Sequence, residues 1–424
     1  MLWLVGTAQL HAIPPSIRST GRKVSSTASM PRKLRMALIG GGGSGFIGRV
    51  HAIAAALDQR AELVAGALSS DPAKARAQAA EFGIAADRAY GSYRDLLDAE
   101  ARLSANERVD FLTIATPNGT HFEIARAALE AGFNVVCEKP LTTTLADAAA
   151  LARRAQITGA VFAVMHGYSG YPLVRQAREL VRSGELGEVQ AIRVNYVQGG
   201  LRGLEPGQSP PRAAWKADPA QAGPSGTLAD IGTHAYHLAR YITGLEPVDV
   251  ACQLRTYHPV RPLDDYGHAV IRFANGALGS LTVSQVTHGR LNDLAIEIDG
   301  RRCSLAWRQE EPNQLLVRRY GEPTRIYERN LRALFLADTA RAACRLPGGH
   351  PEGVLEAFAN VYGNVFQDML IRAEGGRAAS RDTLYPNVCD GWEGVAFIQQ
   401  CLASQRDNGG WKPLTRYNDE DGSA

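Results

Sequence analysis

In the first third of the chain, short apolar runs alternate with amphipathic stretches. The apolar runs have the length of buried strands, and the amphipathic stretches have the period of helices, about 3.6 residues. The apolar runs predict strands at residues 34–39, 62–68, 110–115 and 135–138. The stretches between them predict helices at 48–58, from Pro72 behind a capping Asp71, from Thr120 to Gly132, and at 144–158 before Gly159. Thr120 and Glu123 have the spacing of a capping box. These repeated β–α units indicate an α/β domain with a parallel, doubly wound sheet to about residue 165.

Alternating apolar and polar positions follow from about residue 188, with the period of strands that expose one face. The strands predicted there are residues 188–198, 248–257, 267–273, 277–286, 293–298 and 302–307. Asn275-Gly276 and Asp299-Gly300 are two-residue turn sequences, so we expect hairpins around both pairs. Helical patterns cover 172–183, the segment that ends at Ile242, 354–371 and 390–404. The second domain is therefore predicted to be α+β, with a large open, mostly antiparallel sheet.

The expected domain boundaries follow from this change of pattern. Residues 31–165 form the first domain and 166–412 the second, with a tail at 413–424. Residues 1–30 are set apart as a leader or an over-extended start without a packing pattern, since Ile13 to Pro31 is rich in Ser, Thr, Pro and Arg. We expect that segment to be disordered.

Composition excludes several classes of function. The 424 residues are 45% hydrophobic, enough for a large core, and carry a net charge of only +3, which gives no reason to expect nucleic acid or a membrane as partner. None of the six cysteines forms a Cys-x-x-Cys pair, which disfavours a structural zinc site and a secreted disulfide framework. No apolar run is long enough to cross a bilayer. These features favour a reduced, cytoplasmic compartment, and we expect no metal.

A glycine-rich loop joins the first predicted strand to the first helix. Its sequence, Gly40 to Gly48, allows two registers of G-x-G-x-x-G, and strand, glycine loop and helix together predict a dinucleotide pyrophosphate at the helix N-terminus. Ser69 stands 21 positions after Gly48, where an acid often binds the ribose 2′-hydroxyl. With Ser69 and Ser70 there instead, the cofactor is NAD or NADP, with a lean toward tolerating NADP.

Lys139 follows the buried strand 135–138, and Pro140 ends that strand, so Lys139 lies at the edge where open α/β sheets bind ligands. Asp230 and His234 are four residues apart on a predicted helix and share one face. A lysine, an acid and an imidazole beside a nicotinamide suffice to oxidise a secondary alcohol. Taken singly, each has a structural alternative: a surface lysine, an N-cap and a core histidine.

Taken together, these sequences resemble the glucose–fructose oxidoreductase / inositol 2-dehydrogenase (Gfo/Idh/MocA) family. The resemblance rests on Gly40 to His51, Ala115-Thr116-Pro117-Asn118 with His121, Glu138-Lys139-Pro140, and Asp230-Ile231-Gly232-Thr233-His234, and extends over roughly residues 34–404. It implies an N-terminal Rossmann domain, a C-terminal open-sheet domain that forms homodimers or homotetramers, and an NAD(P)-dependent dehydrogenase acting on a sugar or polyol. The glycine loop is about three residues longer than is usual in the family.

The resemblance also implies roles for single residues. It implies Lys139, Asp230 and His234 as the catalytic group. We expect His234 to be the general base, because an unperturbed imidazole titrates near ~6.5, with Lys139 polarising the substrate or relaying the proton and Asp230 orienting and charge-balancing the pair. The cofactor-binding residues are Gly40, Gly42, Gly45, Phe46, Ile47, Ser69, Ser70, Thr116, Pro117, Asn118, His121, Glu138 and Lys139. Weaker candidates for binding the substrate are Tyr168, Trp215, Lys216 and His237. Two alternatives stay open: a glycosidase that keeps its NAD and oxidises the sugar transiently, and a cofactor-sensing regulator with a silent site.

Overall fold

The computed structural model describes residues 32–43, 46–202, 214–258, 261–376 and 383–417. From Lys33 onward the chain forms one compact unit. Gly45, the leader at 1–30 and most of the tail at 413–424 lie outside the described residues. No helix within the described ranges is both long and apolar enough to span a bilayer.

The first sheet is fully parallel, as the β–α pattern predicts. Its strands are β1 (Leu34–Gly40), β2 (Ala61–Ala67), β3 (Phe111–Ala115), β4 (Asn134–Cys137) and β5 (Phe162–Val164). They lie in the order β2-β1-β3-β4-β5. The order reverses between β1 and β3, which is the switch point where such sheets bind ligands beyond the carboxyl ends of their strands.

Helices connect these strands on both sides of the sheet. They are α1 (Phe46–Ala56), α2 (Pro72–Glu81), α3 (Tyr93–Arg102), α4 (His121–Glu130) and α5 (Leu145–Thr158), with short 3₁₀ turns η1 (Ala86–Arg88) and η2 (Asn118–Thr120). The Asp71 side chain accepts hydrogen bonds from the backbone N–H groups of Ala73 and Lys74, so it caps α2 as predicted. Gly159 ends α5 in the left-handed conformation.

The predicted capping box at Thr120 and Glu123 is wrong. Thr120 is in a helical conformation and its side chain caps nothing, because η2 runs directly into α4. Its Oγ1 lies instead 2.8 Å from Thr116 Oγ1 and 2.8 Å from the carbonyl oxygen of Pro117, to which it donates. The Thr120 hydroxyl therefore ties the turn after β3 to the start of α4.

The second sheet has nine strands and is antiparallel except where β6 pairs with β9. Its strands are β6 (Val189–Val197), β7 (Pro247–Arg255), β8 (Tyr266–Phe273), β9 (Leu278–Ser284), β10 (Asp293–Gly300), β11 (Ser304–Arg308), β12 (Gln314–Arg318), β13 (Arg325–Glu328) and β14 (Lys412–Pro413). The order is β13-β12-β11-β10-β6-β9-β8-β7-β14. This is the predicted large, mostly antiparallel sheet, with β12 to β14 in addition.

Both predicted hairpins form, but their turns differ from the prediction. Gly300 still belongs to β10, and its N–H donates to the carbonyl of Cys303, so Arg301 and Arg302 make the turn. Between β8 and β9 the loop has three residues and ends with Gly276 at a φ of 87°. A glycine in that conformation closes three-residue hairpin loops with a bulge.

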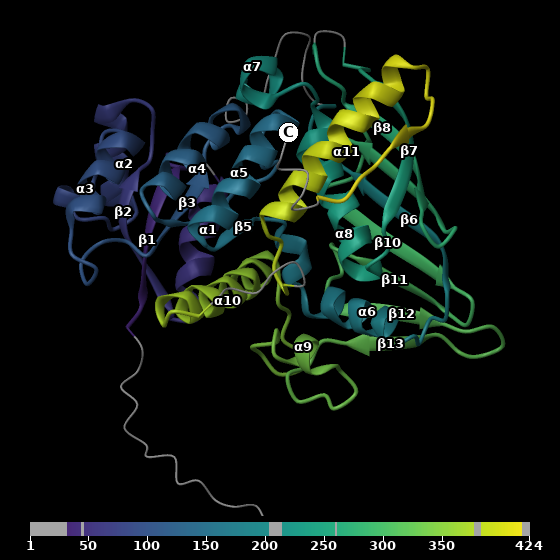
Figure 1. The fold of residues 1–424 in the computed structure, drawn as a ribbon. Coiled ribbons are helices and arrows are strands. Elements are labelled where there is room, and N and C mark those ends of the chain that lie inside the picture. The colour runs from purple at the N-terminus through teal and green to yellow at the C-terminus, as the bar shows by residue number, and fades with distance from the viewer. Residues whose placement is uncertain (1–31, 44–45, 203–213, 259–260, 377–382, 418–424) are drawn as a thin grey trace, which may run out of the picture. The chain divides into compact units, whose positions relative to one another are not determined.

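Helices cover one face of the second sheet. The two long helices near the C-terminus also pack against elements of the first sheet's domain (Figure 1). The elements are η3 (Gly167–Gly170), α6 (Pro172–Arg182), η4 (Ala214–Ala217), α7 (Pro219–Ala222), η5 (Leu228–Gly232), α8 (Thr233–Thr243), α9 (Asp338–Arg341), α10 (Val354–Ala373) and α11 (Val388–Arg406). Helices α6 and α8 share a hydrophobic core with the strands from β6 to β12. Helix α10 packs its apolar face beside α1, while α11 lies against α5 and β7.

Candidate active site

The glycine loop after β1 is shaped by close contacts that leave no room for side chains. Gly40, Gly41 and Gly43 all have positive φ angles. A Cβ on Gly42 would lie 2.6 Å from the carbonyl oxygen of Leu68, and one on Gly48 would lie 2.1 Å from that of Gly41. Strand end and helix start therefore touch through bare backbone, as a pyrophosphate-binding turn requires.

Gly41 and Gly48, which are not among the predicted cofactor residues, also shape this turn. Their contact gives Gly48 the role of the third glycine in the fingerprint, which allows close packing of helix and strand. The second of the two possible G-x-G-x-x-G registers, Gly43 to Gly48, already contained this signal. Gly40 and Gly42 remain at the turn itself, while Phe46 and Ile47 begin α1.

The turns after β3 and β4 are fastened together by His121. Its ring is fully buried, with Nδ1 2.9 Å from the carbonyl oxygen of Pro140 and Nε2 3.0 Å from that of Thr116. Burial lowers the pKa of His121, against the two carbonyls, which raise it. Both ring nitrogens are thus occupied, so the structure gives His121 the task of positioning the loops that carry Pro117 and Lys139.

Glu138 and Asn118 are also held by protein atoms. Glu138 Oε1 lies 3.0 Å from Nε2 of the buried His51, whose Nδ1 lies 2.8 Å from the Tyr362 hydroxyl of α10. Burial raises the pKa of Glu138, but the hydrogen bond and charge of His51 together with Lys139 outweigh it, and the pKa lies below its usual value. Asn118 donates to the carbonyl of Ala222 at 3.0 Å. Glu138 Oε2 also accepts from the backbone N–H of Lys139 at 3.1 Å, so Glu138 helps to set the backbone there, whereas Asn118 ties the turn after β3 to the end of α7.

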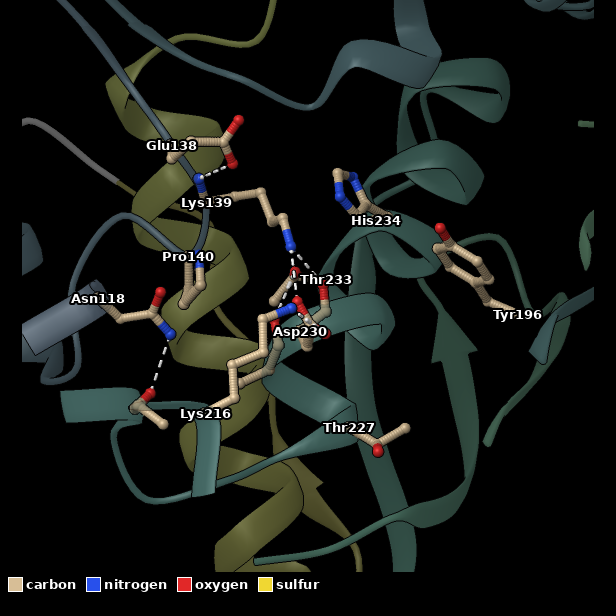
Figure 2. A network of polar contacts seen from close by, with 12 residues as sticks. Asn118, Glu138, Lys139, Pro140, Tyr196, Lys216, Thr227, Asp230, Thr233 and His234 are labelled. Carbon is tan, nitrogen blue, oxygen red and sulfur yellow. Dashed lines mark hydrogen bonds and ion pairs between the residues drawn. The ribbon is translucent and has the colours of Figure 1, made fainter. Parts of the chain in front are cut away.

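Asp230 is the centre of the polar network shown in Figure 2. The Lys139 ammonium donates to Asp230 Oδ1 at 3.1 Å and to the Asp230 carbonyl oxygen at 2.6 Å. Asp230 Oδ2 accepts from Lys216 Nζ at 2.7 Å and from Gln285 Nε2 at 2.9 Å. Burial raises the pKa of Asp230, but Lys216 and Lys139 outweigh it and hold that pKa well below its usual range. The carboxylate is therefore charged at any physiological pH.

A π-helical turn presents this carboxylate. Asp230 lies within η5, and His234 is one turn further on, in the first turn of α8. Single π turns of this kind are frequent at functional sites. Asp230 and His234 line the same cavity, of about 280 Å³, together with Lys139 from the end of β4. The structure thus brings together the three residues that the sequence proposes as the catalytic group.

His234 is the most buried of the three catalytic candidates. Its Nδ1 lies 3.3 Å from Nδ1 of His166, which follows β5, and its ring meets the edge of Tyr168 with centroids 4.8 Å apart. Burial lowers the pKa of His234 well below its usual value, and the charge of Lys139 adds to the effect. The ring is neutral at pH 7, which is the state that a general base needs.

His166 was missed in the sequence. It occupies the position after β5 that Lys139 occupies after β4, and adjacent parallel strands bring their ends to one edge of the sheet. That strand-end position is the signal that could have identified it. Tyr196 and Gln285, which also line the cavity, come from the alternating strand β6 and from the end of β9, where the sequence pattern does not distinguish binding from packing.

The weaker substrate candidates fall into two groups. Lys216 lines the cavity, and Trp215 lines a small adjoining space with Asn118. Tyr168 and His237 lie behind it: the Tyr168 hydroxyl is 2.5 Å from that of Tyr196, and the His237 ring stacks on His166 with centroids 4.5 Å apart. His237 is not among the described residues that line the cavity, so its predicted contact with substrate is not supported.

Ser69 and Ser70 follow β2, next to the glycine loop, whose Gly42 N–H donates to the carbonyl of Leu68. Ser69 Oγ accepts from the N–H of Asp71 at 3.2 Å, and Ser70 is exposed. No acidic side chain stands at either position. The Asp71 carboxylate is turned to the α2 N-terminus that it caps.

Family models match both halves of this architecture. The model described as "Oxidoreductase family, NAD-binding Rossmann fold" matches residues 34–166, and the one described as "GFO/IDH/MocA C-terminal domain" matches residues 174–306. The chain belongs to the Gfo/Idh/MocA oxidoreductase family. The resemblance in the sequence is thereby confirmed, together with the NAD(P)-binding Rossmann domain.

Relatives in this family match between about two thirds and nine tenths of the chain. "Uncharacterized oxidoreductase YfiI" of Bacillus subtilis (strain 168) is 32% identical over 383 residues, which are 90% of this chain and 96% of the relative. "Levoglucosan dehydrogenase" of Pseudarthrobacter phenanthrenivorans is 32% identical over 316 residues, 68% of this chain and 76% of its own. An inositol dehydrogenase homologue from Azotobacter vinelandii, solved with NADH and myo-inositol, is 35% identical, with a TM-score of 0.83 over 91% of this chain and 98% of its own.

The residues present fit the nicotinamide dinucleotide that the family uses. The glycine turn offers backbone N–H groups at the start of α1, at the switch point between β1 and β3. The turn after β3 and Lys139 after β4 border the same edge of the sheet. Within the described ranges, no group of three or more His, Cys, Asp or Glu residues is arranged to hold a metal ion.

Proposed function

We propose that this oxidoreductase is an NAD(P)-dependent dehydrogenase that oxidises a secondary hydroxyl group of a sugar or polyol. One observation carries the proposal: a neutral imidazole, His234, and a cation, Lys139, line one cavity at the carboxyl edge of the dinucleotide-binding sheet. The family relatives support it, since one is a levoglucosan dehydrogenase and another was solved with NADH and myo-inositol.

The bound nicotinamide supplies the hydride acceptor. His234 takes the hydroxyl proton on the ring nitrogen that faces the cavity, Nε2, since Nδ1 is turned to His166. This requires that Nδ1 of His234 carries the ring proton and donates it to Nδ1 of His166. His166, whose pKa is lowered well below its usual value by burial and then by His237, is neutral and accepts that bond.

Lys139 polarises the substrate oxygen. An ammonium group has three donors, and two of those on Lys139 go to Asp230. The third is directed by these two bonds, and we assign it to the substrate oxygen, where it stabilises the negative charge that develops as the proton leaves. Asp230 fixes the position of the ammonium and balances its charge.

The test is turnover on a panel of sugars and cyclitols with NAD and NADP, followed by the absorbance of the reduced nicotinamide. With the substrate so found, His234→Ala and Lys139→Ala should each lower kcat by about 10²- to 10⁴-fold, the usual effect of removing a positioned acid–base group. His288→Ala is the control, because His288 is exposed and outside the cavity.

Three other outcomes would each contradict this proposal. Full turnover in both His234→Ala and Lys139→Ala, at unchanged melting temperature, would disprove the assigned mechanism. Cleavage of a glycoside without net NADH would indicate the glycosidase alternative. Tight cofactor binding without turnover of any substrate would indicate the regulator.

A further inference from the structure

The cavity beside Asp230 holds more positive than negative charge. Among the described residues that line it, Lys139, Lys216 and Arg261 are cations and Asp230 is the one carboxylate. His234 adds no charge at neutral pH, because its ring is held neutral. Glu138, the next carboxylate in sequence to Lys139, is bound to His51 instead. The lining therefore carries an excess of two positive charges.

Both carboxylate oxygens of Asp230 accept hydrogen bonds from residues other than Arg261. Its Oδ1 accepts from Lys139, and its Oδ2 accepts from both Lys216 and Gln285. Arg261 Nη2 makes one long contact, 3.5 Å, to the backbone carbonyl of Lys216, and Arg261 Nε is buried without a hydrogen-bond partner. Within the described ranges, no carboxylate forms an ion pair with this guanidinium.

Such an arrangement is costly unless a ligand completes it. The Arg261 side chain as a whole is half-buried, but its Nε–H is a buried donor without a partner, which costs free energy. A guanidinium presents a planar pair of donors that matches the two oxygens of a carboxylate. The cavity, at about 280 Å³, is near the lower end of small-molecule sites, about 300 Å³, and so suits a molecule of monosaccharide size.

We propose that the substrate carries a carboxylate, which Arg261 binds, and that the substrate class is acidic polyols: uronates, aldonates or cyclitol carboxylates. This inference rests on the proposed dehydrogenase function. In the reaction the carbinol C–H bond gives its hydride to the oxidised nicotinamide of NAD(P), and the O–H proton goes to His234. The alcohol becomes a ketone, the cofactor is reduced, and the carboxylate is unchanged.

The first experiment compares substrates of equal shape and different charge. Initial rates are measured with glucose against glucuronate, galactose against galacturonate and their aldonates, with both cofactors. We expect a kcat/KM at least tenfold higher for the acid in the productive pair. Arg261→Met should lower kcat/KM for that acid by about 10- to 100-fold, mainly through KM, and should leave that of the neutral sugar unchanged. Arg261→Lys should recover part of the loss.

A matched control and a binding measurement make the result decisive. Arg202→Met removes a nearby exposed arginine that does not line the cavity and should change neither sugar. Calorimetric titration of the NADH-loaded protein with the same acids tests Arg261 without turnover. If the acid binds only when Arg261 is present but is not turned over, the inference is upheld and the dehydrogenase function is refuted.

Three outcomes overturn the inference and leave the dehydrogenase function intact. They are a preference for neutral sugars in the wild type, an equal effect of Arg261→Met on acids and neutral sugars, and a preference for a sugar phosphate over the carboxylates.

Discussion

The Nδ1 atoms of His166 and His234 lie 3.3 Å apart, in two buried rings set at 87° to each other. The two residues come from distant parts of the chain: His166 follows β5 of the first sheet, and His234 lies in the first turn of α8, which packs on the second sheet. The contact fixes which nitrogen of His234 faces the cavity. It resembles the arrangement in which a base is oriented by a third group, with an imidazole as the orienting group.

His166 is therefore expected to act through His234. His166→Leu removes the acceptor for Nδ1–H and should lower kcat by about 10- to 100-fold, with little change in KM, because the substrate itself does not touch the residue. His166→Asn should restore much of kcat, since the asparagine oxygen takes the place of Nδ1. Steady-state kinetics of both variants decide this. If His166→Leu and His166→Asn both fold normally and lose the same fraction of kcat, the prediction is contradicted.

The variant Asp230→Asn removes the negative charge of this side chain but keeps its shape. The asparagine oxygen and the backbone carbonyl still accept from Lys139, so turnover should fall at least tenfold less than in His234→Ala. The folded protein should nevertheless lose about 1–3 kcal/mol, because Lys139 and Lys216 lose the anion between them. Turnover and chemical denaturation of one preparation measure both. A loss of turnover as deep as that of His234→Ala would give Asp230 a direct part in the chemistry.

His237 should make the protein sensitive to mild acid. Burial, and then Arg240 and Arg178, lower the pKa of His237 to about 3, whereas an unfolded histidine titrates near ~6.5. Between these values the unfolded chain binds a proton that the folded one does not, so stability falls as pH falls below ~6.5. One such residue costs about 2 kcal/mol at pH 5.

The variant His237→Phe tests this dependence. It should reduce the loss of unfolding free energy between pH 7.5 and pH 5 by about 2 kcal/mol. His288→Phe, at an exposed position, should leave the loss unchanged. Urea unfolding at both pH values is the measurement, and an identical pH dependence in His237→Phe and wild type would refute the prediction.

Ser69 is expected to decide between the two cofactors. With no carboxylate beside the glycine loop, the wild type should accept NADP, and Ser69→Asp should raise KM for NADP at least tenfold while that for NAD changes little, because like charges repel at a partly desolvated site. Ala77→Asp adds the same charge at an exposed position on α2 and serves as control. A wild type that ignores NADP would show the lean toward NADP to be wrong.

Gly48 should tolerate no side chain. An alanine Cβ would lie 2.1 Å from the carbonyl oxygen of Gly41, so the start of α1 must move away from β1. We expect Gly48→Ala to cost about 1–3 kcal/mol and to weaken cofactor binding. Gly363 lies within α10, and a Cβ there would be 3.7 Å from its nearest neighbour, Arg60 Nη1. Gly363→Ala should therefore leave the free energy of unfolding unchanged or raise it by up to about 1 kcal/mol. Thermal unfolding with and without NADH compares the two.

The sequence alone determined four of the five strands of the first sheet and the class of cofactor, whereas the short strand β5 was not predicted. Apolar runs, the glycine turn and the cap at Asp71 are local features, and each depends on residues within a few positions of one another. The same holds for Lys139 at a strand end and for Asp230 and His234 on one helix. The second sheet followed from its alternation, while its turns did not, because Asn-Gly and Asp-Gly pairs fit several loop lengths.

Only the tertiary structure decided which distant residues meet. The contact of His166 with His234 spans 68 positions, and that of His51 with Tyr362 spans 311, which no periodicity encodes. The same is true of the cation excess around Asp230, because Arg261 enters the cavity from a loop of the second domain. Tyr168 and His237 lie behind the cavity because η3 and α8 pack there, which leaves Tyr168 half-buried and His237 buried. Hydrophobic patterns specify which side chains are buried, and the path of the backbone specifies what each one touches.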